Sequence, residues 1–319
     1  MLEVPRILPT AESPGLFWSV MIPTYNPRAD YLEQTLRSVL AQDPGTAQMQ
    51  VEVVDDCSPD VEVETIVKSI AGERVVFSKT PRNLGLAGCW NTCIERSRGQ
   101  WVHILHQDDY ILPGFYQLLA KAAACHPEVG LMATRSLFVE PDGVISGVSP
   151  RLKTLEKGGH TVDDFLYETP VQCPGVVVKR RVYEMNGGFR LDLKYVLDCE
   201  MWARLISSAG GLVTPEALSC YRQGSNGHQS ESQRLCRTGE SLRDLELLNQ
   251  LFAKSYPEFD SKKGSLRLCS TALYLAEHYS KIGDSEAVKV NMKYWKKYYP
   301  SSLRVRLFFG RLARSIIKG

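Results

Sequence analysis

The sequence lacks a long hydrophobic run, a secretion signal and any marked net charge. Among its 319 residues, no apolar stretch approaches the roughly 18–20 residues that a membrane-spanning helix needs. Residues 1–15 (MLEVPRILPTAESPG) do not show the charged and then apolar pattern of a signal peptide. The net charge of +2 gives no reason to expect nucleic acid or a strongly acidic partner. We therefore expect a cytoplasmic protein.

Cysteine pairs with zinc-like spacing are also missing. The nine cysteines are scattered along the chain, and none forms a C-x-x-C pair. An odd number of cysteines spread through expected helices and strands fits reduced thiols better than a disulfide framework. The pattern thus argues against a small disulfide-stapled fold and against a zinc ribbon.

Neither of the two common glycine-rich phosphate loops occurs. The sequence has no G-x-x-x-x-G-K-[ST], and its nearest glycine cluster, NLGLAG at residues 83–88, does not match G-x-G-x-x-G. A bound nucleotide would therefore need another way to neutralise its phosphates. A carboxylate-held Mg²⁺ or Mn²⁺ would serve, because these cations take oxygen ligands and bridge phosphate oxygens.

The first third of the chain alternates strand-like and helix-like segments. Apolar runs predict strands, and apolar residues at helical spacing predict helices between them. This order with short connections predicts an α/β fold, a mostly parallel sheet flanked by helices. The expected strands are Phe17–Ile22, Gln50–Val54, Val75–Phe77 and Trp101–Leu105, and the expected helices are Tyr31–Gln42, Val61–Ile70 and Leu84–Arg98.

Three of these strands end in polar clusters: PTYN, DDCSPD and HQDD. Open α/β sheets bind ligands beyond the carboxyl ends of their strands, so the sequence places a site along this rim. The adjacent Asp108 and Asp109 repel each other unless a bound cation, a nearby Arg or Lys, or solvent offsets their charge. By contrast, His103 alternates with apolar residues in its strand, and we expect a hydrogen-bonded core histidine there.

The character of the sequence changes after about Arg190. Asp198–Ala209 has a helical pattern, and a polar loop (YRQGSNGHQS) begins at Tyr221. From about Glu231 the chain is expected to be helical nearly to its end. We therefore expect two parts, residues 1–230 and a helical C-terminal extension over residues 231–319.

Five motifs in order resemble a family 2 glycosyltransferase with the GT-A fold. They are VMIPTYNP, VVDDCSPD, NLGLAGCWN, ILHQDDYILPG and LDCEMWARL, and the resemblance covers roughly residues 17–225. It implies a metal-dependent, inverting hexosyltransferase whose residues 1–230 bind a nucleotide sugar and carry the catalytic groups. The Q-x-x-R-W signature of processive members is absent, which favours transfer of a single sugar.

The resemblance also implies a nucleotide pocket. Tyr25 would pack on the base, Asp56 would hydrogen-bond it, and Asp108 would contact the ribose. Alternatively, Asp55 and Asp56 only cap a turn, and Tyr25 is an ordinary turn aromatic. The full set that the resemblance assigns to the nucleotide is Pro23, Thr24, Tyr25, Asn26, Asp55, Asp56, Asn83, Gly85 and Asp108.

The metal site carried over from the family comprises Asp108 and Asp109, with Mn²⁺ or Mg²⁺ as the cofactor. His106 stands where these enzymes often have the first Asp of the motif, so which carboxylate binds the metal stays open. His228 would be a third ligand from a C-terminal loop, unless it is simply exposed. Arg222 would contact the diphosphate. The alternative is that the two carboxylates are a solvated strand end or a helix cap.

Asp198 matches the family's catalytic base, with Trp202 and Arg204 following it in the same helix. A general base takes the proton from the acceptor hydroxyl as that hydroxyl attacks the anomeric carbon. One base opposite the leaving group implies a single in-line displacement and therefore inversion. Asp198 also begins a helix, and capping that helix is compatible with catalysis.

The last part of the chain is basic. Residues 287–319 hold nine Lys or Arg and no Asp or Glu. On a helical wheel, the tail separates an apolar arc from a basic arc, which fits either a helix lying on an anionic membrane surface or an ordinary terminal helix packed on the domain. The apolar arc holds Val305, Phe308, Phe309, Leu312 and Ile316, and the basic arc holds Arg304, Arg311, Arg314 and Lys318.

The tail suggests a peripheral location on the inner face of the cell membrane. A transferase held there would meet lipid-linked glycan acceptors, as in bacterial surface polysaccharide or O-antigen synthesis. Two other functions stay open. One is a sugar-phosphate nucleotidyltransferase, although MIPTYNP stands in place of its glycine-rich N-terminal loop. The other is a catalytically inactive, membrane-associated nucleotide-binding protein, for which His106 in place of an Asp gives some support.

Overall fold

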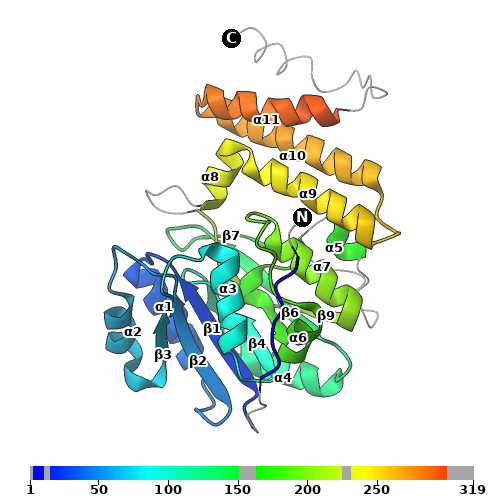
Figure 1. The fold of residues 1–319 in the computed structure, drawn as a ribbon. Helices are drawn as coiled ribbons and strands as arrows, with labels where there is room; N and C mark the ends of the chain where they lie inside the picture. The colour runs from blue at the N-terminus through cyan, green and yellow to red at the C-terminus, as the bar shows by residue number, and fades with distance from the viewer. Residues whose placement is uncertain (1–2, 11–14, 151–162, 168, 225–230, 300–319) are drawn as a thin grey trace. The chain divides into compact units, whose positions relative to one another are not determined.

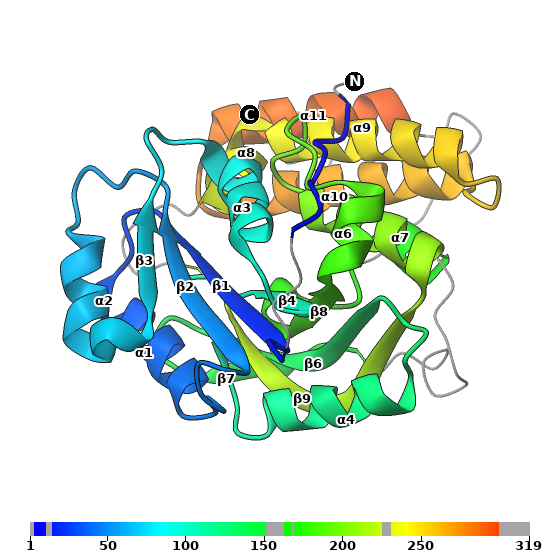
Figure 2. The same ribbon diagram turned by 60° about the horizontal axis from the view of Figure 1, so that its bottom comes forward.

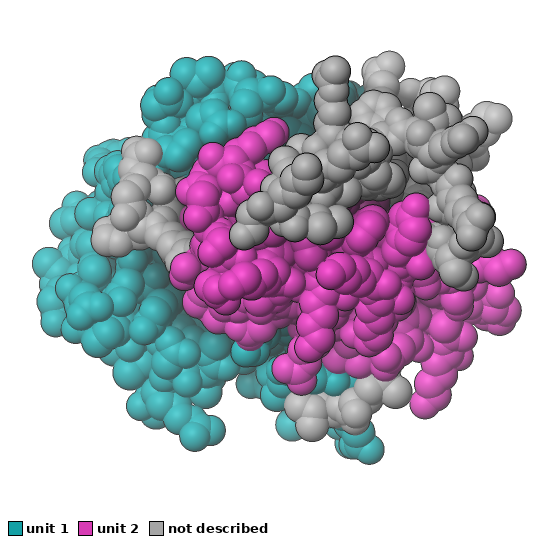
Figure 3. Space-filling view, turned by 90° about the horizontal axis from the view of Figure 1, so that it is seen from above, with its two compact units in different colours: residues 1–227 teal, residues 228–319 magenta. Residues whose placement is uncertain are grey.

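A computed structural model describes residues 3–10, 15–150, 163–167, 169–224 and 231–299. The chain divides into two compact units, residues 1–227 and 228–319, which Figure 3 colours separately. The first unit is a sheet covered by helices, and the described part of the second unit is helical (Figures 1 and 2).

The sheet of the first unit has nine strands among the described residues. Its order is β3-β2-β1-β4-β8-β6-β9-β5, with β7 pairing β6. The strands are β1 (Trp18–Thr24), β2 (Met49–Asp55), β3 (Val76–Lys79), β4 (Trp101–Ile104), β5 (Tyr110–Ile111), β6 (Leu131–Val139), β7 (Ile145–Val148), β8 (Val176–Lys179) and β9 (Gly211–Arg222).

The expected α/β fold is confirmed. Strands β1 to β4 pair in parallel, as their alternation with helices predicts. Beyond β4 the sheet is mixed: β8 runs antiparallel to both β4 and β6, and β9 is parallel to β6. The helices of this unit are α1 (Ala29–Leu40), α2 (Val63–Ala71), α3 (Gly85–Arg96), α4 (Phe115–Cys125), α5 (Asp163–Leu166), α6 (Arg180–Asn186) and α7 (Leu197–Ala209).

The core explains why these segments fold as they do. Every residue of β1 and β2 is buried, as expected for central strands covered on both faces. Helix α1 buries Leu32, Leu36 and Val39, whose spacing of three to four residues forms one apolar stripe. These side chains pack with Val20 and Val51 of the sheet, and α3 crosses the opposite face of β1 and β2 (Figure 2).

His103 lies in β4 and is a fully buried core residue, as predicted. Its Nε2 lies 3.0 Å from the carbonyl oxygen of Pro174, which can only accept, so Nε2 carries the proton. Its Nδ1 therefore accepts from the Tyr116 hydroxyl, also at 3.0 Å. Burial lowers the pKa of His103 to about 4, because an imidazolium there would lose its hydration.

This neutral histidine makes stability depend on pH. The unfolded chain binds a proton at His103 near pH 6.5, whereas the folded chain resists protonation down to pH about 4. Its contribution is complete above pH 6.5 and is lost as the pH falls toward 4, by about 3 kcal/mol in all. We expect denaturant unfolding of wild type and His103→Gln to show this difference in pH dependence. The partly exposed His126, changed to Gln, is the control; parallel profiles for wild type and His103→Gln would contradict the assignment.

The second unit contains four helices among the described residues: α8 (Glu231–Thr238), α9 (Glu240–Ser255), α10 (Ser261–Lys281) and α11 (Ser285–Tyr298). Asp260 caps α10 by accepting from the Lys262 N–H at 2.8 Å, and Asp284 caps α11 by accepting from the Ala287 N–H. The helical C-terminal extension is thus confirmed. None of the described helices combines the length and apolarity that a membrane crossing requires. Of the predicted basic tail, residues 287–319, the part that holds both arcs of the helical wheel, residues 300–319, lies outside the described residues.

Candidate functional site

The polar ends of β1, β2 and β4 meet at one edge of the sheet. In the strand register, Thr24 is opposite Asp55, and Met21 is opposite Ile104. The residues that follow these strands therefore start from the same rim. All three strand ends that the sequence singled out lie there.

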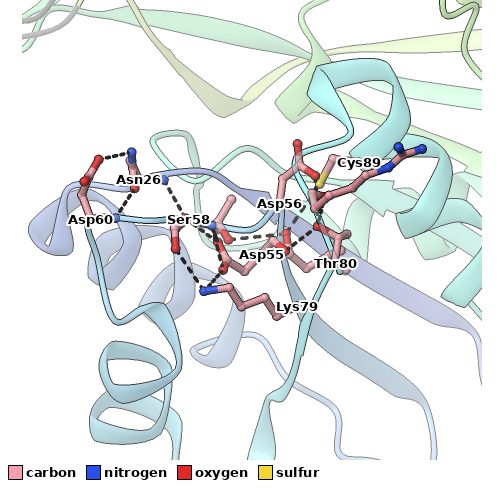
Figure 4. A network of polar contacts seen from close by, with 11 residues as sticks. Asn26, Asp55, Asp56, Ser58, Asp60, Lys79, Thr80 and Cys89 are labelled. Atoms are coloured by element: carbon pink, nitrogen blue, oxygen red, sulfur yellow. Dashed lines mark hydrogen bonds and ion pairs between the residues drawn. The ribbon is translucent and has the colours of Figure 1, made fainter.

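Asp55 organises the turn after β2 (Figure 4). Its carboxylate is 1% exposed and accepts from the backbone N–H and the hydroxyl of Ser58. The Lys79 ammonium lies 3.5 Å from the same carboxylate, so a buried negative charge has a positive neighbour. The turn also holds Cys57 at φ 60°, an uncommon backbone conformation for a residue other than glycine. Asp55 therefore has a structural role whether or not it meets a nucleotide.

Asp56 binds the N-terminal end of α3 (Figure 4). Its Oδ1 accepts from the Leu84 N–H at 2.8 Å and from the Thr80 hydroxyl, and its Oδ2 accepts from the Gly85 N–H at 2.9 Å. A carboxylate at this end of a helix satisfies free N–H groups and complements the helix dipole. Asn83 adds a second acceptor for the Gly85 N–H. Asp56 therefore has a structural role at α3, and a base contact stays a prediction.

We expect Asp56→Asn to destabilise the folded chain by about 1–3 kcal/mol, because an amide NH₂ would face backbone donors that need an acceptor. The measurement is the free energy of unfolding in urea without nucleotide. The exposed Asp60, changed to Asn, serves as the control and should cost no more than about 0.5 kcal/mol. An unchanged stability for Asp56→Asn would show that the cap contributes little.

The turn after β1 is held by side chains from two other elements. The Tyr25 N–H donates to Gln107 Oε1 at 2.7 Å, and Gln107 Nε2 donates back to the Tyr25 carbonyl. Asn26 exchanges two hydrogen bonds with Asp60 and donates its backbone N–H to Ser58 (Figure 4). The Tyr25 side chain is 46% exposed, which leaves its ring accessible. The other two predicted residues of this strand, Pro23 and Thr24, are buried in β1.

The turn after β4 gathers His106, Asp108 and Asp109. Their potential ligand atoms all lie within 4.8 Å of one another. Asp109 is 1% exposed and Asp108 is half-buried. Burial, together with repulsion from Asp109, raises the pKa of Asp108 to about 6. For His106, burial acts to lower the pKa but is outweighed by Cys173 and Asp109, so the pKa lies well above 6.5.

Arg222, at the end of β9, braces this turn. Its N–H donates to Asp109 Oδ1 at 2.8 Å, and its Nε donates to the Asp108 carbonyl at 2.9 Å. The guanidinium stacks 3.9 Å above the Tyr31 ring and also donates to Gln34. Arg222 is thus one positive neighbour of the paired carboxylates. A contact with a diphosphate stays a prediction, and it would require the buried guanidinium to exchange partners.

Asp198 lies in the first turn of α7, close enough to His106 for that residue to lower its pKa. Burial is the larger influence and raises the pKa of Asp198 overall. Its Oδ1 accepts from the Cys199 N–H at 2.8 Å. Tyr221 of β9 lies among the same charges: burial first, and then Asp109, Asp198 and Asp108, raise its pKa. Asp198 thus lies near the turn that carries Asp108 and Asp109.

Helix α7 is fixed by the residues that follow Asp198. The Arg204 guanidinium donates to the carbonyls of Asn186 and Gly188 at 2.6 and 2.9 Å, and it pairs with Glu200. Trp202 is buried and packs edge-on against Phe189. Trp202 and Arg204 therefore hold the helix that carries Asp198.

The residues present fit a divalent cation. Asp109 Oδ2 is buried, accepts no hydrogen bond among the described residues and lies 3.3 Å from His106 Nδ1. Such an oxygen beside a half-buried carboxylate is what a cation would satisfy. The third predicted ligand, His228, lies outside the described residues.

Three residues that contact the predicted site residues were not identified from the sequence. Gln107 fixes the Tyr25 turn, Tyr221 faces the carboxylates, and Trp90 of α3 stacks on the His106 ring at 4.7 Å. Gln107 could have been found, since it sits inside the HQDD cluster. Trp90 lies in the NLGLAGCWN motif and Tyr221 begins the YRQGSNGHQS loop, but their roles at the rim depend on how distant segments pack.

Comparisons with known proteins agree on one family. Residues 19–178 match the family model "Glycosyl transferase family 2". The uncharacterized protein MT1568 of Mycobacterium tuberculosis is 31% identical over 243 residues, which cover 72% of this chain and 73% of that protein. The "Putative teichuronic acid biosynthesis glycosyltransferase TuaG" of Bacillus subtilis is 28% identical over 72% of this chain and 89% of its own.

A solved structure extends the likeness to the fold. Residues 1–349 of TarS from S. aureus, in complex with UDP-GlcNAc, align with a TM-score of 0.61 at 20% identity. The alignment covers 89% of this chain and 79% of that one.

Proposed function

The chain belongs to glycosyl transferase family 2, whose members transfer sugars from nucleotide sugars, and we propose that it moves a single hexose from a nucleoside-diphosphate sugar to an acceptor hydroxyl with inversion and with a bound divalent metal. The observation that carries this proposal is the arrangement of three carboxylates. Asp108 and Asp109 lie in the turn between β4 and β5, and His106 of the same turn acts on the pKa of Asp198.

The rim supplies groups for each part of the donor. The exposed Tyr25 ring offers a face for the nucleotide base, and the Asn26, Asp55 and Asp56 turns beside it supply polar groups. Asp108 would contact the ribose. Asp108 and Asp109 would hold Mn²⁺ or Mg²⁺, which when bound stabilises the charge that develops on the leaving diphosphate.

Asp198 is the proposed general base. The Cys199 N–H donates to one of its oxygens, Oδ1, and the other oxygen is the one proposed to meet the acceptor hydroxyl. Burial raises its pKa, and a carboxylate with a raised pKa is a stronger base than one in water. It takes the hydroxyl proton as the hydroxyl oxygen attacks the anomeric carbon and the bond to the diphosphate breaks.

The proposed acceptor is a glycan, and specifically a lipid-linked one in bacterial surface polysaccharide or O-antigen synthesis. Similarity to the relative named for teichuronic acid biosynthesis supports a surface glycan. The basic tail supports a location at the inner membrane face, where such acceptors lie. If this is correct, the full chain floats with anionic vesicles and not with neutral ones. A protein that stays at the bottom of the gradient with both would contradict the membrane proposal.

The experiment that tests the function is release of nucleoside diphosphate from a panel of UDP-, GDP- and dTDP-sugars, with Mn²⁺ or with EDTA. A membrane lipid extract supplies the acceptor. We expect metal-dependent turnover of one donor class. Tight nucleotide binding without any turnover in the presence of the extract would instead support the inactive binding protein. The family match leaves the nucleotidyltransferase alternative without support.

A further inference from the structure

His106 faces the buried carboxylate of Asp109. Its Nδ1 lies 3.3 Å from Asp109 Oδ2, and that oxygen accepts no hydrogen bond among the described residues. The Asp109 side chain is 1% exposed and therefore lies away from bulk solvent. The position of His106 is the one where the resembling enzymes often have an Asp.

Both side chains are fixed before any ion arrives. The His106 ring stacks on Trp90 with centroids 4.7 Å apart and an angle of 24°, and Trp90 in turn packs edge-on against Phe189. On the other side, the Arg222 N–H holds Asp109 Oδ1 and leaves Oδ2 directed at the imidazole. Ligands that are already oriented lose little conformational freedom when they bind a metal.

The spacing suits neighbouring ligands on one ion. Two ligand atoms bound at about 2.1 Å and at right angles are about 3 Å apart, and opposite ligands of an octahedron are about 4.2 Å apart. The 3.3 Å between His106 Nδ1 and Asp109 Oδ2 is near the separation of two ligand atoms at right angles. The ligand atoms of all three residues lie within 4.8 Å of one another, slightly more than the separation of opposite ligands.

We propose that His106 is a metal ligand, so that a mixed set of one imidazole and two carboxylates selects Mn²⁺ or another transition-metal ion over Mg²⁺. This inference rests on the proposed metal-dependent sugar transfer and specifies which metal that site takes. The chemical reason is that Mg²⁺ strongly prefers oxygen ligands, whereas imidazole nitrogen favours first-row transition metals. In this chain, the departure from the aspartate pattern therefore changes the selectivity of the site and does not abolish it.

The test uses the full chain with its affinity tag removed, Mn²⁺ as the probe, and samples with and without UDP or GDP. Electron spin echo envelope modulation of bound Mn²⁺ should show coupling to an imidazole ¹⁴N in wild type and none in His106→Gln. Titration should show Mn²⁺ binding weakened about tenfold or more in that variant, with Mg²⁺ binding changed by less than about twofold. His126→Gln removes a partly exposed histidine elsewhere and should keep the nitrogen signal.

A second variant covers the risk that His106→Gln disturbs the Trp90 stack. His106→Asp restores an all-oxygen site and should shift the preference toward Mg²⁺ while losing the nitrogen coupling; circular dichroism checks that both variants fold. Bound Mn²⁺ without nitrogen coupling in wild type would overturn the inference and leave metal-dependent transfer intact. Failure of Mn²⁺ to bind under any condition would overturn both the inference and the metal requirement, and the donor panel then tests sugar transfer separately.

Discussion

Asp198→Asn is expected to lower kcat by about 10²–10⁴-fold, the usual contribution of a positioned general base. The amide can still accept from the Cys199 N–H, so the first turn of α7 should remain formed. Affinity for the nucleoside diphosphate should stay within about twofold, because Asp198 is proposed to meet the acceptor and not the nucleotide. The measurement is steady-state turnover of the identified donor, together with calorimetric binding of the free nucleotide.

The control for this prediction is Asp192→Asn. Asp192 lies just before α7 and pairs with Arg190 at 2.8 Å, so its loss tests whether any charge change near this helix lowers turnover. We expect kcat to stay within about threefold of wild type. Equal losses for the two variants would mean that Asp198 acts by holding the helix and not as a base.

The pH profile gives a second readout of Asp198. The base works only when it is deprotonated, so kcat/KM falls as the pH drops through its pKa. Burial raises that pKa above the ordinary value of 3.8, and the acid limb should therefore lie at higher pH than for an exposed carboxyl. In Asp198→Asn this limb should disappear from the residual activity.

Asp108→Asn is expected to reduce metal-dependent turnover by about 10²-fold or more, because the leaving diphosphate would lose several kcal/mol of charge stabilisation. EDTA should reduce wild-type turnover to a similar level, and added Mn²⁺ should restore wild type but not the variant. Turnover and Mn²⁺ affinity are measured on the same preparations. Full activity in EDTA would contradict a metal requirement.

Asp108 is the better choice than Asp109 for this experiment. Asp109 Oδ1 also accepts the Arg222 N–H, so Asp109→Asn would disturb the end of β9 as well as the metal site. Glu216→Gln, an exposed carboxylate elsewhere on β9, is the matched control and should leave turnover unchanged. Unchanged Mn²⁺ affinity in Asp108→Asn would favour Asp109 as the principal metal ligand, a point that the HQDD sequence leaves open.

The sequence predicted the half of the fold that depends on local patterns. The apolar runs of β1, β2 and β4 end in polar clusters, and short helical segments between them allow only a parallel arrangement. Strands β5 and β8 are different. Tyr110–Ile111 is only two residues long, and Val176–Lys179 pairs with strands far away in the chain. Their places follow from tertiary packing, which single-sequence periodicity does not encode.

The same limit applies within the site. Asp55 and Asp56 are equivalent in the sequence, yet one holds the Ser58 turn and the other caps α3. Arg222 was predicted as a diphosphate contact from its loop, but its stacking on Tyr31 depends on α1, which lies far away in sequence. Motif order predicted a shared rim, and the strand register puts the ends of β1, β2 and β4 at one edge of the sheet. Which contacts each of these side chains makes could be determined only from the structure.

In the proposed mechanism one carboxylate, Asp198, drives a single displacement at the rim beside Asp108 and Asp109. The configuration of the anomeric carbon in the product shows whether one displacement occurs. Proton NMR of the product formed from the identified donor and its acceptor should show the configuration opposite to that of the donor. A product that retains the donor's configuration would require a second displacement and would contradict the proposed role of Asp198.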